Sequence, residues 1–240
     1  MCATCGCDSH THTHSHSHSH AHPHDEKHIA VEKDVLYENN LLAARNRGFF
    51  DAKNILAINL VSSPGSGKTT LLERTLTDLK ETLAFSVIEG DQQTTRDADR
   101  IHATGTKVVQ INTGKGCHLD AHMVMHALQG MHPHENGVLF IENVGNLVCP
   151  AMFDLGEKER VVVMSVTEGD DKPLKYPDMF HTSHLCIINK IDLLPYVPFS
   201  LDKAIANAKR INPKLEVITL SCTSGEGLDK WYQWLESKKS

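Results

Sequence analysis

The chain has 240 residues, of which 40% are hydrophobic, and a formal net charge of -6 at pH 7. This length can bury one sizeable core, and the acidic balance offers no electrostatic footprint for nucleic acid or an anionic membrane. No apolar run approaches the roughly 18 residues of a membrane span, and the N-terminus lacks the basic and apolar regions of a secretory signal. We therefore expect a cytoplasmic protein with one domain and an N-terminal extension, and no nucleic-acid or membrane partner.

The first 28 residues are rich in cysteine and histidine. They open with "CATCGC" at residues 2–7, and in a reducing compartment such a cluster favours metal binding over a disulfide. Histidines then recur at every second position between small residues, so we predict that residues 1–28 form a disordered tail. A cloning tag is the alternative, but tags usually carry continuous histidines. The predicted ligands for Ni²⁺, Cu⁺ or Zn²⁺ are Cys2, Cys5 and Cys7, with the tail histidines His10, His12, His14, His16, His18, His20, His22 and His24.

Residues 29–47 read "IAVEKDVLYENNLLAARNR". The apolar residues Val31, Val35, Leu36, Leu42 and Ala43 recur at roughly helical spacing, and Gly48 follows the segment. This pattern predicts a helix that packs on the main domain.

Seven short apolar runs, rich in β-forming residues, alternate with helix-length segments over the rest of the chain. This alternation predicts a doubly wound, mainly parallel seven-stranded α/β sheet with helices on both faces, in one domain that spans residues 29–240. Binding sites in such sheets lie beyond the carboxyl ends of the strands. The seven runs are "ILAINLVSS", "FSVIEGD", "KVVQINT", "GVLFIENVG", "RVVVMSVTEG", "HLCIINKID" and "LEVITLS".

The first strand runs into "SSPGSGKTTLLERTL", which has the order strand, glycine-rich loop and helix that a P-loop NTPase requires. Loop N–H groups would cradle the phosphates, Lys68 would reach the β and γ oxygens, and the Thr69 hydroxyl would bind Mg²⁺. Ser62 replaces the first glycine of the usual pattern, and a structural glycine turn is the alternative interpretation. The predicted phosphate-binding residues are Gly65, Ser66, Gly67, Lys68, Thr69 and Thr70.

Two acids stand at strand ends. Glu142 suits the second Mg²⁺ shell, and Gly145, three residues later, could sense a γ-phosphate through its N–H. Asp91 suits the metal shell or the orientation of the attacking water. The alternative for Glu142 is an acid that merely ends a strand, and the alternative for Asp91 is a helix cap. We predict catalytic roles for Lys68, Asp91, Glu142 and Gly145, and Mg²⁺ binding by Thr69, Asp91 and Glu142.

The sixth run closes with an NKxD motif, Asn189, Lys190 and Asp192. Guanine presents N1–H and N2–H₂ side by side, and one carboxylate can accept both, so Asp192 would select GTP over ATP. "SCTSGEG" after the last strand suits backbone contacts to the base, with Ser221 and Cys222 foremost. No arginine finger is evident, so we expect slow hydrolysis of GTP to GDP.

Cys117 and His118 follow the third strand, and Cys149 follows the strand that carries the predicted γ-phosphate sensor. Two thiolates and an imidazole suit Ni²⁺ or Zn²⁺, and this placement would couple the metal to the nucleotide. The alternative is that both cysteines are buried small hydrophobes. His122 and His126 lie at i, i+4 on the next helix, and we interpret them as a solvated face in preference to extra ligands.

Taken together, "CATCGC", "SSPGSGKTTLL", "GCHLDA", "FIENVGNLVCPA", "SVTEGDDKPLKYP" and "NKIDLLPY" resemble the HypB family of hydrogenase-maturation GTPases. The resemblance covers the first seven residues and nearly everything from about residue 29. It implies a GTPase of the signal-recognition-like P-loop class that uses Mg²⁺, forms a homodimer with GTP or metal, and helps insert nickel into [NiFe]-hydrogenase. The implied partners are a HypA-type metallochaperone and the hydrogenase large-subunit precursor.

The resemblance also implies roles for particular residues. Cys117, His118 and Cys149 correspond to a metal site at the dimer interface, and the three N-terminal cysteines correspond to a nickel site. A lysine of "GDDKPLKYP" would reach the partner's nucleotide, and we select Lys175 over Lys172. Two alternatives stay open: a protein that mainly stores or buffers nickel, and a GTPase that also serves urease maturation.

Overall fold

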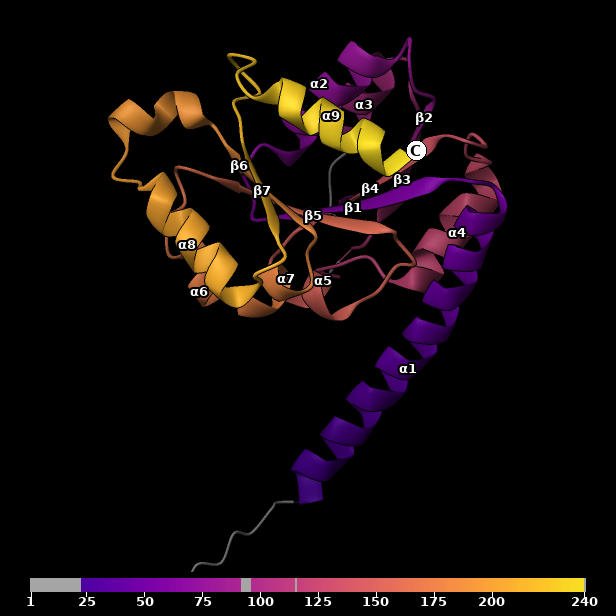
Figure 1. Ribbon diagram of the computed structural model, residues 1–240. Coiled ribbons are helices and arrows are strands. Elements are labelled where there is room, and N and C mark those ends of the chain that lie inside the picture. The colour runs from indigo at the N-terminus through magenta and orange to yellow at the C-terminus, as the bar shows by residue number, and fades with distance from the viewer. Residues whose placement is uncertain (1–22, 92–95, 115, 240) are drawn as a thin grey trace, which may run out of the picture. The chain divides into compact units, whose positions relative to one another are not determined.

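The computed structural model describes residues 23–91, 96–114 and 116–239 (Figure 1). The chain divides into two units, Met1–Asp34 and Val35–Ser240. Most of the predicted ligands of the N-terminal tail lie outside the described residues. His24 is the exception, because it lies in the helix that opens the described chain. The ligands outside the description are Cys2, Cys5, Cys7 and the histidines from His10 to His22.

Helix α1, Pro23–Ala52, is longer at both ends than the predicted 29–47. It begins inside the segment that we predicted to be disordered, so that prediction is wrong for residues 23–28. A proline is pre-organised for the first helical turn, which suits the start of the helix at Pro23. At the other end the helix continues past Gly48, because the packing of the buried Phe50 offsets the roughly 1 kcal/mol that a helical glycine costs.

The face of α1 that packs on the domain differs from the predicted apolar face. Val35 is 51% exposed, whereas Asn39, Ala43, Asn46 and Phe50 are buried. These four residues follow helical spacing, so the prediction of a packed helix is confirmed. The error in the face has a physical cause, because two of the buried residues are polar and apolar periodicity cannot find them.

Seven parallel strands form one sheet with the order β3-β2-β4-β1-β5-β6-β7. Six strands lie within their predicted runs and β5 begins one residue before its run, so the prediction of a doubly wound parallel sheet is confirmed. The strands β1 and β5, which flank each other at the centre, are buried along their whole length. The bounds are β1 Leu56–Ser62, β2 Phe85–Asp91, β3 Lys107–Asn112, β4 Val138–Gly145, β5 Glu159–Ser165, β6 Leu185–Asn189 and β7 Glu216–Thr219.

Helices cover both faces of the sheet (Figure 1). Alternate side chains of β1 show how, since Ile58 and Leu60 pack with apolar residues of α2 and α9, while Val61 packs with α7 and α8 on the other face. The remaining helices are α2 Lys68–Leu79, α3 Arg96–Ala103, α4 Ala121–Met131, α5 Cys149–Met152, α6 Lys172–Lys175, α7 Pro177–His181, the 3-10 helix η1 Ile191–Tyr196, α8 Leu201–Ile211 and α9 Leu228–Lys239.

Membrane insertion of a helix finds no support in the part of the chain that is described, since no helix there is both long and apolar enough to span a bilayer.

Candidate functional site

The loop between β1 and α2 surrounds a pocket of about 560 Å³ at the carboxyl edge of the sheet. Gly65 and Gly67 have φ angles of 76° and 94°, a left-handed conformation that strains any residue with a Cβ. A Cβ on Gly67 would also collide with the side-chain amide of Asn189. The two glycines therefore shape the loop and allow the base motif to approach it.

Lys68 and Thr69, the first residues of α2, converge on one carboxylate oxygen. Glu142 Oε1 accepts from Lys68 Nζ at 2.9 Å and from Thr69 Oγ1 at 2.6 Å. Glu142 is 1% exposed, and its second oxygen is buried without a hydrogen-bond partner. Hydroxyl and carboxylate oxygens at the mouth of a phosphate loop are a donor set that fits Mg²⁺. Asp91 and Gly145 line the same pocket, so the structure brings the predicted catalytic residues together.

Glu89 is an acid in this region that was not predicted from the sequence. It lies opposite Glu142 in the register of β2 and β4, and it is 2% exposed. Burial, followed by the charges of Glu142 and Asp91, raises its pKa to about 8. The signal was present in "VIEGD", because residues two apart on a strand share a face, and Glu89 therefore shares the face of Asp91.

Asn189 and Lys190 tie the phosphate loop to the base motif. Asn189 Nδ2 donates to the carbonyl of Ser66 at 3.0 Å, and Lys190 Nζ donates to that of Gly65 at 2.7 Å. Asn189 Oδ1 accepts from the Cys222 N–H at 3.2 Å, which brings in the loop after β7. The sequence reading assigned these residues to nucleotide contacts, and the structure adds that they position the loop itself.

Asp192 lies in η1 just beyond this junction, and its Oδ1 atom is buried without a hydrogen-bond partner. Ser221 and Cys222, which we predicted to close the base pocket, follow β7 in the chain, and both are buried. Burial raises the pKa of the Cys222 thiol to about 11, so that this thiol stays neutral at pH 7. A carboxylate oxygen without a hydrogen-bond partner can accept a hydrogen bond from the edge of a base.

Lys175 does not line the phosphate pocket of its own chain. Its Nζ pairs with Asp171 at 2.8 Å, and the hydrogen bond that it donates to this carboxylate raises the Lys175 pKa. Lys172 pairs with Glu168 at 3.3 Å and is more buried. The role that we predicted for Lys175 concerns a partner subunit and stays a prediction.

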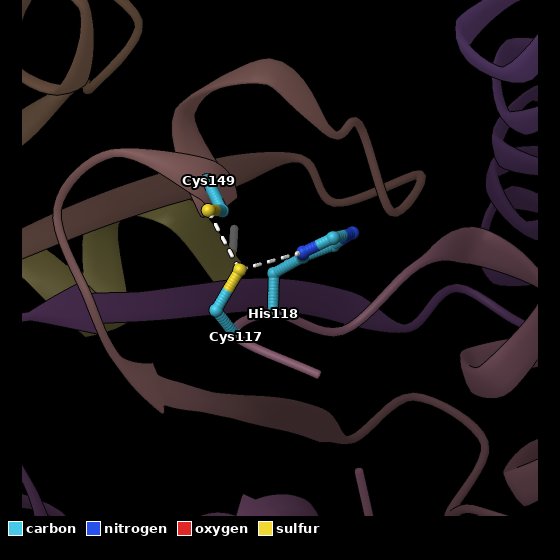
Figure 2. A group of neighbouring side chains, drawn as sticks. All are labelled: Cys117, His118 and Cys149. Carbon is cyan, nitrogen blue, oxygen red and sulfur yellow. Dashed lines mark hydrogen bonds between the residues drawn. The ribbon is translucent and has the colours of Figure 1, made fainter. Parts of the chain in front are cut away.

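A second group of neighbouring side chains consists of Cys117, His118 and Cys149 (Figure 2). Cys117 and His118 lie between β3 and α4, and Cys149 opens α5, four residues after β4 ends. The two sulfurs are 2.7 Å apart, Cys117 Sγ lies 3.6 Å from His118 Nδ1, and all three ligand atoms fall within 4.8 Å of one another. Soft sulfur and imidazole donors at this separation fit Ni²⁺ or Zn²⁺.

The surroundings of this group keep its histidine neutral. The His118 ring stacks on Phe153 with centroids 3.9 Å apart, and burial lowers the His118 pKa against the opposing charge of Asp120. The hydrogen bond with Cys149 and burial raise the pKa of the Cys117 thiol. Metal binding at this group must therefore displace a thiol proton, while the imidazole is ready to bind.

His122 and His126 are exposed on α4, with their Nε2 atoms 3.1 Å apart. Neither belongs to a described group of three or more metal-binding side chains. Their exposure agrees with the predicted solvated face.

Comparisons with known proteins support this description of the nucleotide pocket. The family model described as "CobW/HypB/UreG, nucleotide-binding domain" matches residues 56–219. The hydrogenase maturation factors HypB of Rhizobium leguminosarum bv. viciae and of Escherichia coli strain K12 are each 60% identical over 211 residues, 88% of this chain, and the match covers 71% and 73% of those relatives. The chain belongs to the HypB family. The matched residues of the family model include the phosphate loop, the NKxD motif and the three metal-binding candidates.

Two solved HypB structures share the fold. HypB from Archaeoglobus fulgidus superposes with a TM-score of 0.80 at 40% identity, covering 85% of this chain and 100% of that one. HypB from Helicobacter pylori in complex with nickel gives 0.79 at 38% identity, covering 84% and 95%. The signal recognition particle 54 kDa protein from Aeropyrum pernix K1, in complex with GDP, is 12% identical with a TM-score of 0.51, and this likeness concerns the fold alone.

Proposed function

We propose that this HypB-family chain is a GTP-hydrolysing nickel metallochaperone that supports the insertion of nickel into [NiFe]-hydrogenase. The observation that carries the proposal is the position of Cys149. It lies four residues beyond Gly145 on the segment that leaves β4, so one strand serves both the nucleotide pocket and the soft-ligand group. The names of the relatives, and the nickel in the complex of one of them, agree with this role.

Hydrolysis in this proposal rests on positioning. Lys68 leaves Glu142 to reach the β and γ oxygens, and Thr69 and Glu142 provide oxygen ligands for Mg²⁺, which neutralises developing charge when bound. Asp91 orients the attacking water, and the Gly145 N–H senses the γ-phosphate. Asp192 accepts from guanine, which makes GTP the substrate.

Turnover should be slow. Arg100 lines the pocket, but its guanidinium is engaged with Glu73 at 2.5 Å and with Asp97 at 3.6 Å. An arginine held by two carboxylates is a poor stabiliser of charge on a γ-phosphate. Lys68→Ala should abolish hydrolysis and leave nickel binding by the first seven residues intact, and the loss of both together would argue against separable sites.

The metal group is proposed to respond to the nucleotide. A shift of the segment after Gly145 on loss of the γ-phosphate would move Cys149 relative to Cys117 and His118, and by linkage metal would then change nucleotide affinity. We further propose that GTP or metal brings two chains together with this group at their interface, and that Lys175 reaches the partner's nucleotide. A HypA-type metallochaperone and the hydrogenase large-subunit precursor complete the proposed partners, in the cytoplasm.

Two alternative roles remain beside this one, nickel storage and additional service to urease maturation. The histidine-rich tail favours nickel storage, and a chain without residues 8–28 tests it: normal hydrogenase activity at limiting nickel supports delivery, while lost nickel tolerance alone supports buffering. A relative from Helicobacter hepaticus, named hydrogenase/urease maturation factor HypB, is 40% identical over 220 residues and keeps service to urease as the second role.

The deciding experiment is X-ray absorption at the nickel edge, with GDP and with a non-hydrolysable GTP analogue. The chain should carry serine at positions 2, 5 and 7, so that sulfur ligands report on the candidate group. We expect sulfur coordination that differs between the two nucleotides, and its loss in Cys149→Ala. Cys186→Ala is the matched control, because Cys186 is fully buried in β6. Identical coordination in both nucleotide states would exclude the coupling.

A further inference from the structure

The buried face of α1 contains two asparagines where a helix ordinarily presents apolar residues. Asn39 is 6% exposed and Asn46 is 2% exposed. A buried amide costs about 1 to 3 kcal/mol when its hydrogen bonds are missing. The partners of these two side chains therefore indicate what holds this helix in place.

Both asparagines bond to the same two segments of the domain. Asn39 Oδ1 accepts from the N–H of Ala121 at 2.9 Å, and its Nδ2 donates to the carbonyl of Asp154 at 2.8 Å. Asn46 Nδ2 donates to the carbonyls of Ala121 at 2.9 Å and Leu155 at 3.1 Å. One asparagine thus holds the N–H of Ala121 and the other holds its carbonyl, and each also holds the segment at 154–155.

These segments carry the metal-binding candidates. Ala121 lies three residues after His118, and Asp154 lies five residues after Cys149. Phe153, directly before Asp154, is the ring that stacks on His118. A fixed distance between Ala121 and Asp154 therefore sets how closely the two halves of the group approach each other.

Two further observations show close contact between α1 and the segment at residues 154–156. Arg47 donates two hydrogen bonds to the carboxylate of Asp154, at 2.8 and 2.9 Å. Gly156 has a φ of 90°, and a Cβ there would lie 2.6 Å from the carbonyl oxygen of Ala43 and 2.8 Å from Cβ of Asn46. Only a glycine allows the loop to come so close to the helix.

We propose that α1 positions the metal site, with Asn39 and Asn46 holding the His118 segment and the Cys149 segment at the separation that one ion requires. This inference rests on the proposed function of the Cys117, His118 and Cys149 group. Residues that orient metal ligands typically change metal affinity by 10- to 100-fold when they are replaced. No described residue of α1 lines the phosphate pocket, so nucleotide binding should be spared.

The test uses the full chain with serine at positions 2, 5 and 7, titrated with Ni²⁺ alone. The readout is the sulfur-to-nickel charge-transfer absorption, which the tail histidines do not produce. Cys186 and Cys222 do not contribute to it, because burial raises their thiol pKa values to about 12 and about 11. Binding of a fluorescent GDP analogue reports on the fold in the same samples.

We expect Asn39→Leu and Asn46→Leu each to weaken nickel binding in this band by about 10-fold or more, with GDP-analogue affinity within about twofold of the parent. Asn212→Leu is the matched control. Asn212 also donates to backbone carbonyls, those of Phe180, His181 and Ser183, but it does so at the end of α8. That variant should lose thermal stability and keep nickel affinity.

Unchanged nickel affinity in both leucine variants, with GDP-analogue binding intact, would overturn the positioning role. If those variants lose GDP-analogue binding, Asn39→Asp decides, because it keeps an acceptor for the Ala121 N–H and loses the donor to Asp154. An intermediate loss of nickel affinity supports the proposal and no loss refutes it. An absent charge-transfer band in the parent would refute the metal site of the proposed function. This outcome is distinct from a failure of the positioning role of Asn39 and Asn46, in which the parent shows the band and the leucine variants keep its nickel affinity.

Discussion

Glu89 and Glu142 lie opposite each other on the neighbouring strands β2 and β4, where both carboxyl groups are buried. Two adjacent buried carboxylates repel each other, so both ionise only where a cation compensates them. Lys68 supplies that cation to Glu142 at 2.9 Å. Burial first, and then the charges of Glu142 and Asp91, raises the pKa of Glu89 to about 8. Glu89 is therefore mostly protonated at pH 7 in the nucleotide-free protein.

The first prediction is a pH dependence of stability that Glu89→Gln removes. The pKa of Glu89 is about 8 when folded and near the ordinary 4.5 when unfolded, so between these values the folded state binds the extra proton. The free energy of unfolding then falls as pH rises from about 4.5 to about 8, by at most about 1.4 kcal/mol per pH unit. In urea unfolding without nucleotide or Mg²⁺, the free energy of unfolding of Glu89→Gln should increase steadily over this range relative to that of the wild type.

The control for this prediction is Glu81→Gln, because Glu81 is exposed. The free energy of unfolding of this variant should change with pH as that of the wild type does. A constant difference between Glu89→Gln and the wild type from pH 5 to pH 8 would show that the Glu89 carboxyl titrates normally.

The second prediction concerns Gly67→Ala. The φ of 94° strains any residue with a side chain, and the new methyl group would collide with the Asn189 amide that bonds to Ser66. We expect GTP affinity to fall by at least about 10-fold, since about 1 to 3 kcal/mol of strain enters the phosphate loop. Gly130→Ala should bind GTP normally and gain up to about 1 kcal/mol of stability, because Gly130 lies inside α4 with open space at its Cβ. Equal GTP affinity in the two variants, measured by calorimetry, would contradict this account of the loop.

The third prediction is a change of base specificity in Asp192→Asn. The buried Oδ1 of Asp192 is suited to accept from N1–H and N2–H₂ of guanine, and an amide donor there would face the N2 donors instead. Loss of a buried hydrogen-bond match costs discrimination of about 10⁴-fold in favourable cases, and we expect GTP affinity to fall by at least about 100-fold. Xanthosine triphosphate, which has an oxygen at position 2, should recover binding. The exposed Asp202→Asn is the control, and a variant at Asp192 that still prefers GTP would sink the assignment.

The sheet could be predicted almost completely from the sequence, for a physical reason. Its strands are short apolar runs bounded by turns, and parallel strands buried on both faces carry that signal in their own residues. The phosphate loop was equally predictable, because the glycines, Lys68 and Thr69 are adjacent in the chain. Motifs of neighbouring residues encode local geometry, so their placement on strand and helix ends follows directly.

The features that the sequence reading missed depend on contacts between distant residues. Glu89 becomes unusual only when β2 pairs with β4 and sets it against Glu142. Asn39 and Asn46 resemble solvent-facing residues until the loop at 154–155 offers carbonyls to them. The start of α1 at Pro23 was missed for the opposite reason, since the histidine pattern before it outweighed a local capping signal.

The last prediction concerns the buried pair of Glu157 and Arg160, whose side chains are 5% and 7% exposed. Arg160 Nε donates to Glu157 Oε1 at 2.9 Å, and the same guanidinium donates to the carbonyls of Ala151 and Phe153 on the segment that follows Cys149. Arg160→Met leaves the Glu157 charge uncompensated and should cost about 3 to 5 kcal/mol in urea unfolding. Adding Glu157→Gln removes the stranded charge, so the double variant should be more stable than Arg160→Met alone.

An exposed pair provides the comparison for this prediction. Lys53 and Glu135 are 36% and 64% exposed, so Lys53→Met should cost about 1 kcal/mol or less. The comparison separates burial from charge, because both substitutions remove one partner of an ion pair and differ in access to water. Equal losses for Arg160→Met and Lys53→Met would mean that Glu157 is solvated in the folded protein. A double variant less stable than Arg160→Met would instead show that the Glu157 carboxylate stabilises the fold through Asn59 and the Leu155 N–H, its other hydrogen-bond partners.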